Sequence, residues 1–244
     1  MAAPAPGSPA ATIEPGRLNP ILDVFFSPAA AMDTLARRPR FLVALLVITV
    51  VSIGVMGIAF ERGVTEHGIR QKFESSPRFE RIPAEQREAV IDRAVHIGSY
   101  TAVVGAAVGP ALGLLLTSGV LLLFLMPLGG LRVTLRQVMA VVTHAWLPLS
   151  LSGLVGIPIL LAKDPDQVDF QNIVPMANLS FLFSPTDQHK LYMAAASIDL
   201  FSLWTIALLA IGLSRLTGKS KGAVLPVILA PWILYIVIFK VLLG

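Results

Sequence analysis

Residues 41–60 read FLVALLVITVVSIGVMGIAF, a stretch of twenty residues without a charged side chain. A helix rising about 1.5 Å per residue needs about 20 apolar residues to cross the ~30 Å hydrocarbon core of a bilayer. The apolar side chains follow one another without alternation, which excludes a strand of an outer-membrane barrel. The stretch therefore predicts a membrane-spanning α-helix.

Four further apolar runs follow this one. The uncharged run 96–131 is longer than one crossing needs, so its helix must begin outside the bilayer, tilt, or kink at Pro110. We place its membrane part at 101–125, and we place the remaining spans at 138–162, 192–213 and 222–243. The sequence thus predicts an all-α polytopic membrane protein, a bundle of five transmembrane helices.

The composition supports this class of protein. Of the 244 residues, 55% are hydrophobic and 14% are charged, whereas soluble domains have about 45–50% and about 25%. The chain has no cysteine, which excludes disulfides, thiolate zinc sites and cysteine nucleophiles. The formal charge of +4 does not indicate a nucleic-acid partner, because the cations form short clusters beside apolar runs, where they orient helices and meet anionic lipid.

The N-terminal region divides into two parts. Residues 1–18 are rich in proline and alanine and predict a disordered tail, which lacks the charged and apolar regions of a signal peptide. Residues 20–38 predict two short helices at the membrane surface, the second opened by Ser27-Pro28 as N-cap and first-turn pair. A loop packed on the bundle is the other interpretation of this segment.

Positive charge indicates the orientation. The N-terminal side holds nine basic residues and the opposite side ten, so the total decides nothing. Density is more informative, because the loops after the second and fourth spans are short and wholly basic, and Arg37-Arg38-Pro39-Arg40 adjoins the first span. We therefore expect a cytoplasmic N-terminus and, in a bacterium, location in the inner membrane.

Several short motifs resemble those of the bacterial Yip family, the Ypt/Rab-interacting-protein domain. Before the first span these are Asn19-Pro20, Phe26-Ser27-Pro28 and Arg38-Pro39-Arg40. Near the last two spans they are the runs 199–204 (DLFSLW), 208–213 (LLAIGL) and 218–222 (GKSKG). The resemblance covers about residues 19–243 and implies five transmembrane helices, a cytoplasmic N-terminus and a very short extracytoplasmic C-terminus. Eukaryotic members are associated with small GTPases and vesicle traffic, but the eukaryotic cytoplasmic motifs are not visible in this chain.

The chain lacks the common catalytic motifs and phosphate-binding glycine loops, so we expect neither enzymatic activity nor a cofactor. The loop after the first span offers a weak metal candidate. Glu88, Asp92 and His96 share one helical face, and Glu66 and His67 could approach from the other arm of the loop. A solvated charged face with opposite-charge neighbours is the competing interpretation, and we expect no metal site.

Two of the predicted spans contain an acidic or a histidine side chain. Asp199 is the only acidic one, and such a carboxyl must be neutralised, paired or exposed to water. We expect it to be hydrogen-bonded in the bundle close to Ser202, with an ion or proton pathway as the alternative. His144 is expected to hydrogen-bond a carbonyl that the Pro148 kink frees.

Small and apolar residues suggest two packing features. Gly105, Gly109 and Gly113 recur every four residues and predict close helix contact, either within the bundle or between two copies. The apolar patch Leu179–Phe183 is too short to cross the membrane and predicts an interfacial or re-entrant piece.

These features together favour a non-enzymatic membrane scaffold. Its expected surroundings are the lipid bilayer, other membrane proteins or a second copy of the chain. The alternative is a small transporter or ion-conducting protein that uses Asp199 and His144. The halves of the chain show no convincing inverted repeat, which weighs against transport. An intramembrane enzyme has the least support, because no catalytic pair is evident.

Overall fold

The computed structural model describes residues 19–74, 76, 79–128, 132–168, 173, 177–184 and 187–242. The predicted disordered tail, 1–18, lies outside these residues. The described residues form helices joined by turns and loops, and their only β-pairing is an isolated bridge between Asn178 and Asp199.

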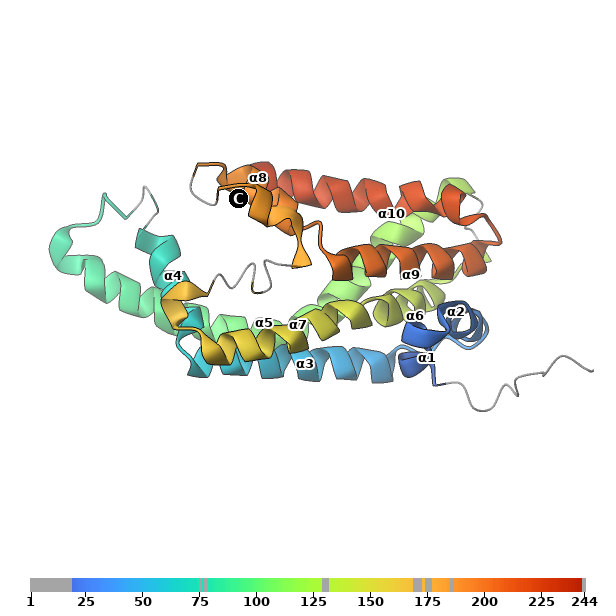
Figure 1. The fold of residues 1–244 in the computed structure, drawn as a ribbon, viewed down its shortest axis with the longest axis horizontal. Coiled ribbons are helices and arrows are strands. Elements are labelled where there is room, and N and C mark those ends of the chain that lie inside the picture. Colours follow the sequence, from blue (N-terminus) through green and yellow to red (C-terminus); the bar gives the residue numbers. More distant parts are fainter. Residues whose placement is uncertain are drawn as a thin grey trace, which may run out of the picture.

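Five helical segments of the described residues are long and apolar enough to cross a membrane. They are α3 (Leu42–Glu61), α5 (Ala84–Leu125), α6 with α7 (Leu135–Ala145 and Leu147–Ala162), α9 (Leu200–Thr217), and α10 with η6 (Lys221–Tyr235 and Ile236–Leu242). They run along the long axis of the molecule, as Figure 1 shows. The predicted all-α membrane bundle is therefore confirmed.

The second span belongs to a single helix of 42 residues, α5. At about 1.5 Å per residue such a helix is about twice as long as the hydrocarbon core is thick. Its polar first part therefore extends outside the bilayer, where α4 (Val64–Glu74) packs beside it. The two form a charged stalk at one end of the molecule (Figure 1).

The third span is two helices that meet at Trp146. Pro148 has no N–H to bond back to the preceding turn, so α7 starts anew with this proline in its first turn. The first half, α6, begins before the predicted 138 because Thr134 and Gln137 form a capping box. The Gln137 N–H donates to Thr134 Oγ1 at 3.3 Å, and the Thr134 N–H donates to Gln137 Oε1 at 2.9 Å.

The predicted start of the fourth span, 192, is wrong. A separate helix, α8 (His189–Ala196), precedes the span, and α9 begins only at Leu200. The apolar run continues through both helices, so hydropathy alone could not show the break. The span ends at Thr217 rather than 213, where Gly218 adopts a left-handed conformation with φ of +70°.

The two predicted N-terminal helices are present as α1 (Pro20–Phe26) and α2 (Pro28–Arg37). Val24, Met32 and Leu35 are fully buried and belong to the main core cluster, together with residues of α6 and α9. Figure 1 shows α1 and α2 beside α6, at the end of the bundle where α9 finishes. The helices therefore pack on the bundle as well as lying at its end, and we call this pair the α1–α2 cap.

The core is concentrated near the α1–α2 cap. A smaller cluster of Ala59, Val64, Leu160 and Val168 holds α3, α4 and α7 together near the stalk. Elsewhere the spans expose large apolar side chains, including Leu46, Leu116 and Leu154. Such an exposed apolar surface suits a protein whose surrounding solvent is lipid.

Candidate functional site

Asp199 lies at the beginning of α9, not within a continuous helix as the sequence suggested. Its Oδ1 accepts the backbone N–H groups of Phe201 at 2.8 Å and Ser202 at 3.0 Å. The Ser202 hydroxyl donates to Oδ2 of the same carboxyl. The carboxyl thus satisfies N–H groups that have no partner within the helix, which is the usual work of an N-cap aspartate.

The start of α9 also contacts the loop before α8. Asn178 forms the isolated bridge with Asp199, and its Oδ1 accepts the Ser180 N–H at 2.9 Å. The predicted interfacial piece here is a 3-10 helix, η5 (Leu179–Leu182), which packs against α8 and leaves Phe181 exposed. In Figure 1, α9 begins well inside the bundle, whereas α3 and α7 continue toward the stalk.

His144 is buried in α6 with 3% of its surface exposed. Its Nδ1–H donates to the Ala140 carbonyl oxygen at 2.9 Å, one helical turn earlier. The expectation that it would bond a carbonyl freed by Pro148 is wrong, because Pro148 leaves the carbonyl of residue 144 itself without its helical partner. The Trp146 N–H, at the junction of α6 and α7, donates to the Val142 carbonyl oxygen at 3.0 Å.

The metal candidates of the stalk make other contacts. Arg70 of α4 lies 3.3 Å from Glu88 and 3.7 Å from Asp92, and its hydrogen bond to Glu88 raises the pKa of Arg70. The His96 ring lies edge-on to Tyr100, with 4.9 Å between ring centroids. Among the described residues, no group of three acidic or histidine side chains is arranged to hold a metal, and Glu66 and His67 do not join one.

Only one glycine of the predicted stripe meets another helix. A Cβ atom on Gly113 would lie 3.3 Å from the Trp146 ring. The same atom on Gly105 or Gly109 would have no neighbour within 4 Å, and both residues are exposed. Packing inside the bundle therefore does not account for these two glycines.

The close approach of helices occurs at a glycine that the sequence analysis did not single out. A Cβ on Gly212 would lie 2.3 Å from Val141 Cγ1 and 3.0 Å from Met32 Sδ. This glycine lets α9 approach α6 and α2 at the centre of the core. It lies in the run LLAIGL that carries part of the family resemblance, but without helix registers its partner could not be found.

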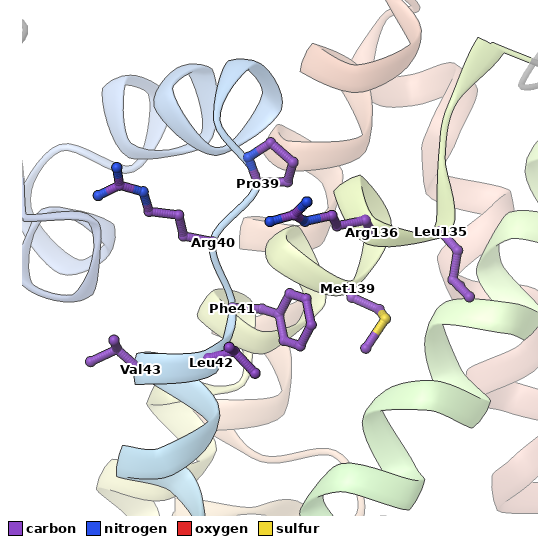
Figure 2. Close-up of a pocket in the computed structure, with 8 residues that line it drawn as sticks. All are labelled: Pro39, Arg40, Phe41, Leu42, Val43, Leu135, Arg136 and Met139. Atoms are coloured by element: carbon purple, nitrogen blue, oxygen red, sulfur yellow. The ribbon is translucent and has the colours of Figure 1, made fainter.

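A groove opens between the start of α3 and the start of α6, and its volume is about 670 Å³. It is lined by Pro39, Arg40, Phe41, Leu42, Val43, Leu135, Arg136 and Met139. Figure 2 shows Arg136 directed from α6 toward the Pro39–Phe41 linker, with Phe41 beside the start of α3, Met139 on α6, and the Arg40 side chain pointing away from Arg136. Within the described part of the chain, neither Arg40 nor Arg136 has an ion pair. We call this feature the arginine groove.

The arginine groove and the α1–α2 cap lie at the same end of the bundle. Two polar contacts join the cap to the bundle there. Arg215 Nε of α9 lies 3.4 Å from Asp33 Oδ1 of α2, and Gln137 Nε2 of α6 donates to the Ala36 carbonyl oxygen at 3.1 Å. The sequence does not predict these contacts or the groove, because each joins segments about a hundred or more residues apart.

The fold and these features define an integral α-helical membrane protein with five candidate spans. The family model described as the Yip1 domain matches residues 22–242. The chain therefore belongs to the Yip family, which confirms the predicted resemblance. Comparisons with curated proteins and with solved structures gave no match.

Proposed function

We propose that this protein is a non-enzymatic membrane scaffold that presents the α1–α2 cap to other membrane proteins or to a second copy of itself. The observation that carries the proposal is the burial of the cap, since Met32 and Leu35 are fully enclosed between the cap and the bundle. A surface held rigidly before it meets a partner loses less conformational entropy on binding.

The cap offers apolar contacts on its outer side. Phe26 is 85% exposed and Leu22 is 56% exposed, although Val24 of the same helix is fully buried. Neighbouring Phe25 is held in place by an edge-on contact with Trp204 of α9, with 5.5 Å between ring centroids. The cap therefore combines fixed aromatic side chains with an exposed one that a partner can bury.

A cytoplasmic location of the cap is part of the proposal. The described residues at this end contain two acidic side chains, Asp23 and Asp33. They contain eight basic ones: Arg37, Arg38, Arg40, Arg132, Arg136, Arg215, Lys219 and Lys221. Basic residues in short loops remain on the cytoplasmic side, so in a bacterium this end faces the cytoplasm from the inner membrane.

Photo-crosslinking from single positions tests the scaffold. A photoreactive amino acid at position 26 should give discrete protein adducts in native membranes, because this position is exposed on the cap. The matched control is position 46, where Leu46 of α3 is 62% exposed along the span and should meet lipid. Protein adducts at position 46 but not at position 26 would contradict the proposal.

Transport is the second candidate, and the start of α9 favours it. A helix that begins inside the bundle at a carboxylate resembles the interrupted helices that form ion sites in transporters. The Thr205 hydroxyl, three residues after Ser202, is buried without a hydrogen-bond partner.

Reconstitution separates the two candidates. Proton or cation flux in vesicles should be absent for the wild type and for Asp199→Asn, because the carboxyl caps its own helix. If the wild type shows flux and a normally stable Asp199→Asn variant does not, the protein is a transporter and the scaffold proposal is wrong.

A further inference from the structure

We propose that the arginine groove binds the headgroup and upper acyl chains of an anionic phospholipid. The proposal does not depend on the scaffold function, because it rests on the geometry of the groove alone. Its volume of about 670 Å³ lies within the range of about 300–1,000 Å³ that small-molecule sites occupy.

The groove lies at the depth of lipid headgroups. Arg40 lies two residues before Leu42, the first residue of α3, and Arg136 is the second residue of α6. Both arginines therefore lie where spans begin, in whichever leaflet this end of the molecule resides. Basic pockets between transmembrane helices at this level bind anionic headgroups.

The charge of the groove is unbalanced. Arg40 and Arg136 are exposed and have no acidic partner among the described residues, whereas Arg215 at the same end is paired with Asp33. A guanidinium donates two parallel hydrogen bonds to phosphate and is less strongly hydrated than an ammonium group. Arg136 is directed toward the linker and offers its guanidinium to a phosphodiester, whereas the Arg40 side chain extends from the other side of the linker and adds positive charge at the same level (Figure 2).

The apolar lining identifies the occupant as a lipid. Below Arg136 in Figure 2, the groove is lined by Phe41 and Leu42 at the start of α3 and by Met139 of α6. Leu42 is 69% exposed and Val43 is 66% exposed, and this apolar surface continues along α3 at Leu46. A soluble phosphate would leave the surface uncovered, and an acidic peptide would have to enter hydrocarbon. Acyl chains can cover it without such a cost.

Native mass spectrometry of the delipidated full-length protein in detergent tests the site. The probes are phosphatidylglycerol and phosphatidylcholine with identical acyl chains. The wild type should bind phosphatidylglycerol more tightly, and Arg40→Gln with Arg136→Gln should weaken that binding about tenfold, since each basic group near a lipid surface contributes several-fold. Equal binding of the two lipids by the wild type would overturn the proposal.

The matched control removes the same charge at the same end of the molecule but outside the groove. Arg38→Gln with Arg132→Gln changes two exposed arginines that do not line it, and should alter binding by no more than about twofold. Equal weakening by both double variants would show diffuse attraction and overturn the site. Displacement of the lipid by an equal concentration of glycerol phosphate would identify a soluble phosphate as the ligand. This result would also overturn the proposed lipid site. Melting temperatures establish that both variants are folded.

Discussion

Individual residues acquire their roles from what the fold brings next to them, and Gly212 is the clearest example. Gly212→Ala should destabilise the protein by about 1–3 kcal/mol, because the new methyl group would overlap the stiff, β-branched and fully buried Val141. Thermal unfolding in detergent measures the effect.

Gly109→Ala is the control for this substitution. It places the same methyl group on an exposed helical glycine with no neighbour within 4 Å. Its stability should remain within about 1 kcal/mol of the wild type, since alanine is the better helix former. Equal losses in the two variants would mean that the contact between α9 and α6 is not close.

Asp199 allows a second test at this scale. Asp199→Ala should cost about 0.5–2 kcal/mol, because the backbone N–H groups of Phe201 and Ser202 lose their acceptor. Asp199→Asn keeps an oxygen in place and should unfold close to the wild-type temperature, since Asn and Asp are comparable N-caps. An Asn variant as unstable as the Ala variant would show that the negative charge, and not the cap, stabilises α9.

At the scale of elements, the α1–α2 cap is part of the folded bundle. Leu35→Ala should destabilise the protein by about 2–5 kcal/mol, the usual loss for a fully buried leucine, although it lies before the first span. Chemical or thermal unfolding in detergent measures this loss.

Phe26→Ala serves as the comparison within the same pair of helices. The Phe26 side chain is 85% exposed, so its removal should change stability by less than about 0.5 kcal/mol. If Leu35→Ala were equally harmless, the cap would be resting on the membrane without being attached to the bundle.

At the scale of the whole molecule, the charged stalk and the end that carries the arginine groove should lie on opposite sides of the membrane. The chain has no cysteine, so single cysteines can be introduced without a background. Gln86→Cys, in the exposed first turns of α5, should react with a membrane-impermeant maleimide on intact cells.

Lys219→Cys, in the exposed turn before α10, should react only after permeabilisation. Both positions are exposed, so a difference in labelling reports their side of the membrane and not burial. If only Lys219→Cys were labelled on intact cells, the protein would have the opposite orientation in the membrane.

The class of the molecule can be predicted from the sequence. Continuous apolar runs, a low charge content and short basic loops predict five spans, two N-terminal helices and a second apolar run longer than one crossing needs. Local signals of this kind depend on residues within a few turns of one another, so they can be interpreted without knowing the fold. The match to the Yip1 domain over residues 22–242 agrees with that interpretation.

Which residues meet depends on the packing of the helices. An apolar run does not show that α8 ends at Ala196 and that Asp199 begins a new helix, because hydropathy is similar on both sides of the break. It does not show that Gly212, rather than Gly109, lies against a neighbouring helix, because registers between helices depend on packing. The arginine groove joins position 40 to position 136, and only the arrangement of α3 beside α6 creates it.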